Sequence, residues 1–120
     1  MANILVVDDS VTLRQMVALT LTNAGHQVNQ AESGEAALAA LKTFVPDLIL
    51  TDMYMPGIDG ITLAAEVRAN PLFARTPILV LSTDSSQEVK QRGRDTGVTG
   101  WVSKPFDPEK LQNLVARVLH

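Results

Sequence analysis

The chain has 120 residues, 46% of them hydrophobic, which is enough to bury one core and too few residues for two ordinary domains. Ten lysine and arginine residues against thirteen aspartate and glutamate residues give a net charge of -3, which argues against nucleic-acid binding. The sequence has no cysteine and no apolar run long enough for a signal peptide or a membrane span. We therefore expect one soluble, cytoplasmic domain over residues 1–120.

Short apolar runs alternate with longer amphipathic segments along the chain. Runs such as Ile4–Val7 and Ile78–Leu81 are branched and do not alternate with polar residues, which predicts strands buried on both faces. The more polar segment 26–31 predicts an edge strand, and apolar spacings of three and four predict helices. In chain order the predicted elements are a strand at 4–7, a helix at 11–23, a strand at 26–31, a helix at 34–43, a strand at 48–51, a helix at 60–69, a strand at 78–81, a helix at 85–96, a strand at 100–103 and a helix from Pro108.

The helix predicted over residues 85–96 has almost no apolar face. Val89 is its only large hydrophobic residue, and Gly93 lies inside it. A helix held by so little apolar surface has low local stability, which suits an element that moves. Its basic side chains, together with Trp101 and the last helix, predict a partner-binding face: Lys90, Arg92 and Arg94.

Five strands alternating with five helices predict an α/β fold, a doubly wound parallel sheet covered on both faces. In such sheets, ligands bind beyond the carboxyl ends of the strands. Polar side chains follow four of the predicted strands within a residue or so, and we expect them to converge on one small area: Asp8, Asp9, Asp52, Ser82 and Lys104.

This group of side chains predicts phosphoryl chemistry. Three neighbouring carboxylates repel one another and need a cation, and an all-oxygen ligand set favours a hard ion such as Mg²⁺. Lys104 is a mobile point charge suited to a phosphoryl group, and Ser82 offers a hydroxyl donor. The arrangement is therefore expected to accept a phosphoryl group on Asp52 as an aspartyl phosphate.

Four motifs, in order and with matching spacings, carry a resemblance to a known family: Val6–Ser10, Asp52–Gly60, Pro77–Ser82 and Lys104–Phe106. With them, the chain resembles the receiver domains of two-component response regulators and is similar to the stand-alone chemotaxis regulators. The resemblance implies a flavodoxin-like (βα)5 fold with strand order 2-1-3-4-5. It also implies a phosphorelay protein that takes its phosphoryl group from a histidine kinase.

The resemblance assigns the metal and phosphoryl positions residue by residue. Asp52 matches the phosphoacceptor, and the pair Asp8 and Asp9 matches the acids that position Mg²⁺. Tyr54 matches a position whose backbone carbonyl ligates the ion. Lys104 matches the lysine of the last motif, whose bond to the next residue is cis in the family; here that residue is Pro105.

Two further residues match the switch positions of the family. Phosphorylation is expected to draw the Ser82 hydroxyl toward the phosphoryl oxygens, and the Trp101 ring then turns inward beneath the helix at 85–96. Since the sequence ends at His120, after the last helix, we expect no output domain and a monomer that signals by protein contact, for example with a flagellar switch.

Two other classes of function remain open from the residues. A Mg²⁺-dependent phosphatase or other small-molecule phosphotransferase would carry a second acid where Tyr54 stands, and a flavin carrier would need a phosphate-binding loop in place of Asp8 and Asp9. We therefore expect catalysis only of the protein's own phosphorylation and dephosphorylation. His26 and His120 are expected to be solvated and not ligands.

Overall fold

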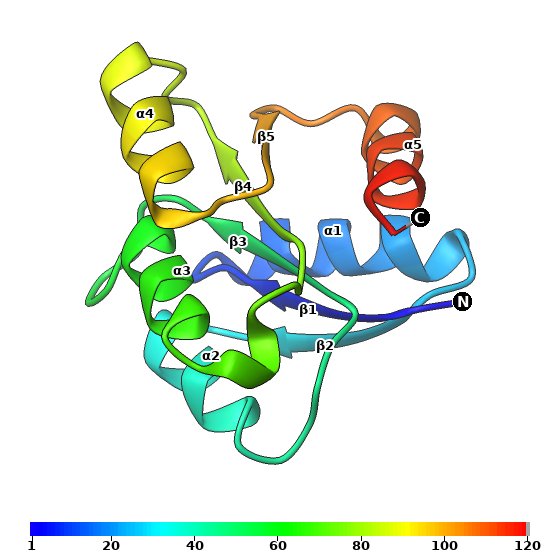
Figure 1. Cartoon of the computed structure of the whole chain (residues 1–120). Coiled ribbons are helices and arrows are strands. Elements are labelled where there is room, and N and C mark those ends of the chain that lie inside the picture. Colours follow the sequence, from blue (N-terminus) through cyan, green and yellow to red (C-terminus); the bar gives the residue numbers. More distant parts are fainter. Residues whose placement is uncertain (120) are drawn as a thin grey trace.

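Five parallel strands form one sheet in the computed structural model, which describes residues 1–119 (Figure 1). Their order is β2-β1-β3-β4-β5. Each neighbouring pair is parallel, so both the predicted α/β class and the strand order 2-1-3-4-5 are confirmed. The strands are β1 (Asn3–Val7), β2 (Gln27–Ala31), β3 (Leu48–Asp52), β4 (Ile78–Ser82) and β5 (Gly100–Ser103).

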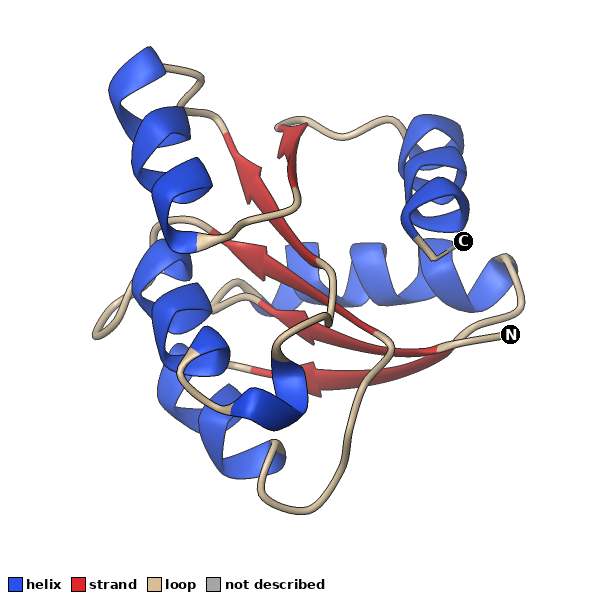
Figure 2. Cartoon of the chain, viewed as in Figure 1, coloured by secondary structure: helices blue, strands red, loops and turns tan. Residues whose placement is uncertain are grey.

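Helices connect the strands and cover both faces of the sheet. Helices α1 and α5 lie on one face, and α2, α3 and α4 lie on the other (Figures 1 and 2). None of the helices within residues 1–119 combines the length and apolarity needed to cross a membrane. The helices are α1 (Val11–Asn23), α2 (Gly34–Ala40), α3 (Gly60–Arg68), the 3₁₀ turn η1 (Pro71–Phe73), α4 (Gln87–Thr96) and α5 (Pro108–Val118).

The core consists of two apolar layers that share the sheet. Successive strand residues point to opposite faces, so Ile4 and Val6 pack on the α1 and α5 side while Leu5 and Val7 pack on the α2 and α3 side. Because both layers need apolar strand residues, β1 and β4 show no polar alternation. The same burial fixes the register of the strands and hence the position of the residue that follows each of them.

Two boundaries differ from the sequence prediction by two residues or more. Helix α2 ends at Ala40 and not at Thr43, because the amides of Lys42 and Thr43 bond to carbonyls three residues back, which tightens the chain into a turn. Helix α4 begins at Gln87 and not at residue 85, since the Ser86 side chain accepts a hydrogen bond from the Val89 amide and caps the helix there. The sequence analysis also missed the short turn η1.

Helix α4 packs on the sheet through a tryptophan and a glycine. The Trp101 side chain of β5 lies against a small cluster formed by Met53, Ile61 and Val80. A Cβ atom added to Gly93 would lie only 2.5 Å from Cζ2 of the Trp101 ring. The missing side chain of Gly93 therefore makes room for the ring, which packs against α4. The expected turn of Trp101 on phosphorylation stays a prediction.

We predict that Gly93→Ala lowers the free energy of unfolding of the parent protein and raises that of the Trp101→Ala variant. In the parent, the clash with Trp101 costs about 1–3 kcal/mol and outweighs the gain of about 1 kcal/mol in helix propensity. In Trp101→Ala the clash is absent, so only the stabilising gain remains. Urea unfolding of the four proteins measures both changes, and the same sign in both backgrounds would contradict the packing described above.

Candidate functional site

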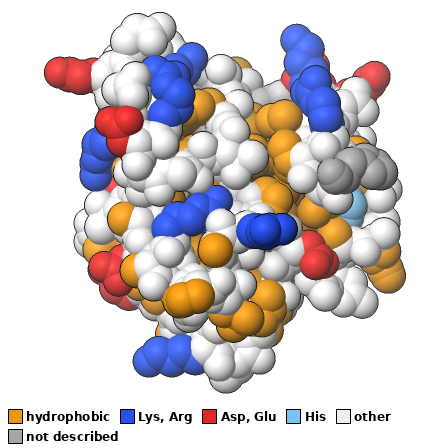
Figure 3. Space-filling view, viewed as in Figure 1, with side chains coloured by type: hydrophobic (Ala, Val, Ile, Leu, Met, Phe, Trp, Pro, Cys, Tyr) orange, Lys and Arg blue, Asp and Glu red, His pale blue; other side chains and the backbone are white. Residues whose placement is uncertain are grey.

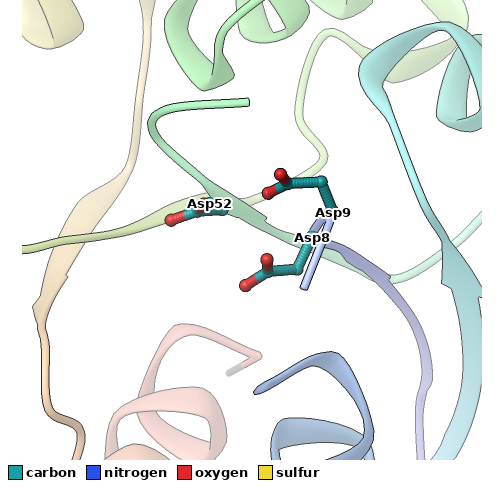
Figure 4. Close-up of side chains that lie close together, drawn as sticks. All are labelled: Asp8, Asp9 and Asp52. Atoms are coloured by element: carbon teal, nitrogen blue, oxygen red, sulfur yellow. The ribbon is translucent and has the colours of Figure 1, made fainter. Parts of the chain in front are cut away.

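Three carboxylates meet at the carboxyl edge of the sheet, as predicted. Asp8 directly follows β1, and Asp52 is the last residue of β3. One oxygen from each of Asp8, Asp9 and Asp52 lies within 4.8 Å of the others, and Figure 4 shows the three side chains side by side. Asp8 and Asp52 are buried, at 2% and 7% exposure, whereas Asp9 is exposed to solvent. The cluster is therefore open on the side of Asp9.

A lysine that directly follows β5 reaches the Asp52 carboxylate of this cluster. The Lys104 Nζ atom lies 2.5 Å from Oδ1 of Asp52, and both side chains are largely buried. The Lys104 amide donates to the Ser82 carbonyl at 3.0 Å, which continues the β4–β5 ladder past the strand end. The peptide bond between Lys104 and Pro105 is cis, as the resemblance implied.

Burial raises the pKa of Asp8 above the ordinary value of 3.8. The nearby charges of Asp52 and Asp9 raise it further, while a hydrogen bond from the Ser10 amide and the charge of Lys104 lower it. The Ser10 bond is 2.9 Å long and ends on Asp8 Oδ1. The charged form of Asp8 is thus disfavoured in the folded protein when no cation is present.

The site fits a hard divalent cation. Three carboxylates face one ammonium group, which leaves an excess of negative charge in a partly buried place. All the donors are oxygens, which are the ligands that Mg²⁺ prefers. Asp8, Asp9 and Asp52 could hold the ion, and the cluster leaves positions for water or a phosphoryl oxygen. The role of the Tyr54 carbonyl stays a prediction.

Ser82 lies beside the cluster at the end of β4, and its hydroxyl oxygen accepts a hydrogen bond from the Asp84 amide at 2.9 Å. The Asp84 carboxylate in turn accepts bonds from the Tyr54 hydroxyl at 2.6 Å and the Ser86 amide at 2.9 Å. The bond to Tyr54 and the bond to Ser86 lower the pKa of Asp84. This network joins the two loops that border the site. Sequence reasoning missed Asp84, whose only signal was its place in a polar loop.

The predicted partner-face residues do not share one environment. Arg92 turns toward α3 and forms an ion pair with Asp59 at 3.0 Å, so it serves helix packing. Arg94 is exposed and bonds to Gln91 on its own helix at 2.9 Å. Lys90 is half-buried. Of the three, Arg94 is thus the exposed cation that bonds within α4 and not to another element.

Both histidines are predicted to be solvated, and the structure describes one of them, His26. His26 is half-buried, and its Nδ1 atom accepts a hydrogen bond from the Ala2 amide at 3.2 Å. Burial and the nearby N-terminal charge lower its pKa below 6.5. His26 thus holds the start of the chain to the loop before β2 and is more than a solvated side chain. His120 lies outside the described residues.

Residues 4–116 match the family model of the response regulator receiver domain. With the fold and the acid cluster above, the chain belongs to this family. Receiver domains of two-component systems take phosphoryl groups from histidine kinases and contact target proteins, and they bind Mg²⁺ in the active site.

Three similar proteins illustrate the relationship. The chemotaxis response regulator CheY4 of Vibrio cholerae has 44% sequence identity and a TM-score of 0.93, with 98% of each chain covered. Protein PilH of Pseudomonas aeruginosa is 32% identical over 99% of this chain and 98% of its own length. The receiver domain of the sensor histidine kinase PA1611 from Pseudomonas aeruginosa, solved with a magnesium ion in its active-site cleft, has 26% identity and a TM-score of 0.90, with 98% of this chain and 97% of that chain covered. The chain spans about half the length of the curated transcriptional regulators it matches.

We predict that Asp8→Asn stabilises the metal-free protein at neutral pH. The pKa of Asp8 lies above 3.8 in the folded protein, whereas the ordinary value of 3.8 applies to the unfolded chain. At pH values between the two, folding takes up protons, so the free energy of unfolding falls as pH rises through that interval. Asn keeps the acceptor for the Ser10 amide and removes the charge. In a chelator at pH 7, the melting temperature should rise by roughly 3–5 °C, as for a change of about 1 kcal/mol.

The rise in melting temperature caused by Asp8→Asn should shrink at pH 3, where the Asp8 carboxyl of the parent is protonated in both the folded and the unfolded state. Glu66→Gln on exposed α3 surface is the matched loss of one charge and should leave the melting temperature nearly unchanged. A variant Asp8→Asn that melts below the parent at pH 7 would show that the buried charge is not a cost.

Proposed function

We propose that the chain is a phosphorylation-controlled signalling protein that accepts a phosphoryl group on Asp52 from the phosphohistidine of a sensor kinase. The observation that carries this proposal is the Lys104 ammonium 2.5 Å from Asp52, inside a cluster of three carboxylates. Asp8 and Asp9 would hold Mg²⁺, together with Asp52 and the Tyr54 carbonyl. When bound, the ion supplies charge neutralisation for the phosphoryl oxygens.

The transfer step needs little from the protein beyond position and charge. A carboxylate oxygen of Asp52 attacks phosphorus and forms a P–O bond, while the P–N bond of the donor breaks and its electron pair stays on the imidazole nitrogen. Lys104 neutralises the carboxylate before the transfer and a phosphoryl oxygen after it, and Ser82 donates its hydroxyl to another phosphoryl oxygen. Water later cleaves the acyl phosphate to inorganic phosphate, so the protein catalyses only its own modification and is not an enzyme acting on other substrates.

The environment of Tyr54 disfavours the phosphatase alternative. The position that would carry a second acid holds a tyrosine, whose hydroxyl donates to Asp84 and cannot act as a carboxylic acid. The flavin alternative is disfavoured by Asp8 and Asp9, whose charges would repel a cofactor phosphate.

Chemotaxis is the proposed pathway, with a protein target such as a flagellar switch. The similarity to CheY4, over 98% of both chains, supports it. The proposed target surface is the groove between β5 and α5, which is lined by Trp101, Leu114 and two cations, Lys110 and Arg117. In Figure 3, Lys and Arg side chains lie over α4 and α5, with hydrophobic side chains in the hollow between them. Together with Arg94 on α4, this surface favours an acidic amphipathic segment of the target.

We predict that a small-molecule phosphodonor such as acetyl phosphate, with Mg²⁺, adds one phosphoryl group to the parent protein. Intact-mass analysis should show the adduct in the parent and in the control Asp95→Asn, which changes an exposed carboxylate on α4. The adduct should be absent in Asp52→Asn and in a chelator. Phosphorylation that persists in Asp52→Asn would overturn the assignment of the acceptor.

A further inference from the structure

The Arg14 side chain links the acidic loop to the edge strand of the sheet. Arg14 lies near the start of α1 and is half-buried. One terminal guanidinium nitrogen donates to the backbone carbonyl of Asp8 at 2.7 Å. Its Nε atom donates to Oε1 of Gln30 on β2 at 3.1 Å. The guanidinium is therefore held on both sides, which fixes its own position as well as that of the carbonyl it contacts.

The bonded carbonyl belongs to the peptide unit that joins Asp8 to Asp9. Because a peptide unit is planar, the direction of this carbonyl sets the direction in which the chain enters Asp9. The other polar groups of Asp8 are also fixed: its amide donates to the Ala31 carbonyl at 3.1 Å, and its carboxylate accepts from Ser10. The bond from Arg14 holds the remaining backbone polar group of Asp8, the carbonyl of the peptide unit that leads into the exposed Asp9.

We propose that Arg14 is a positioning residue for the divalent cation site, acting through the peptide between Asp8 and Asp9. The inference rests on the proposed function, in which this site binds Mg²⁺. With Arg14 in place, the carboxylate of Asp9 starts close to the other two, within 4.8 Å, before the ion arrives. Without Arg14, the loop must be ordered on binding, and that ordering reduces the affinity.

A simple charge effect predicts the opposite result. The guanidinium is a cation beside a cation site, so removing its charge lowers the repulsion felt by Mg²⁺ and raises the affinity. Positioning and charge therefore give changes of opposite sign in Arg14→Gln. Gln30→Ala separates the positioning effect from the charge effect further, because it removes the bond to the Arg14 Nε atom and changes no charge.

The test is titration of the metal-free protein with Mg²⁺ by calorimetry, supported by Mn²⁺ binding followed by electron paramagnetic resonance. Arg14→Gln should weaken binding on the order of 10-fold, as for other residues that orient metal ligands. Gln30→Ala should weaken it less, and the double variant should be no weaker than Arg14→Gln alone, since both act through one contact. Arg75→Gln removes the same charge from an exposed position elsewhere and should bind like the parent.

A kinetic readout distinguishes positioning from general damage. In Arg14→Gln the Mg²⁺ concentration that half-saturates phosphorylation by acetyl phosphate should rise, while the rate at saturating Mg²⁺ changes much less. Equal or tighter Mg²⁺ binding by Arg14→Gln would overturn the inference; if that variant does not fold, unchanged binding by Gln30→Ala overturns it. A parent protein that binds no Mg²⁺ would instead refute the proposed function.

Discussion

The main constraint on this structure is that three carboxylates lie crowded together at one edge of a parallel sheet. Because the strands run in the same direction, their carboxyl ends share one edge of the sheet, and three aspartates at or just after the ends of β1 and β3 meet there. Two of the aspartates are buried, and one of these, Asp52, contacts the ammonium group of Lys104. The fold thus maintains a concentration of negative charge that would be unfavourable in a site with no ligand, and the same charge favours the binding of a cation.

The elements around the site keep these charges in place. The apolar layers on both faces of the sheet fix the strands and leave little freedom to the residues at their ends. The loops that border the site are held by polar contacts: Arg14 orients the peptide after Asp8, and Asp84 joins Tyr54 to the start of α4. Helix α4 rests on Trp101 through the space left by Gly93. A change at Asp52, the proposed phosphoacceptor, therefore has direct physical neighbours through which it can reach the surface of α4 and β5.

Much of this arrangement could be predicted from the sequence, because it depends on local patterns. Apolar runs such as Ile78–Leu81 identify buried strands, and the polar residue after each run identifies the site. The strand order came from the resemblance to receiver domains, since periodicity does not determine it. The contacts of Arg14, Gly93 and Asp84 could not be predicted, because each joins residues far apart in the chain whose side-chain directions depend on tertiary packing. The early end of α2 was missed because helix propensity continues past it.

The central claim is that the folded protein holds Asp8 in a site that disfavours its charge until a cation binds. A carbon-13 NMR titration of the Asp8 carboxyl, assigned with the help of Asp8→Asn, measures this directly. We expect a titration midpoint above 3.8 in the metal-free protein, and a lower midpoint when Mg²⁺ is added. A midpoint at or below 3.8 without metal, or one that Mg²⁺ does not move, would contradict the account.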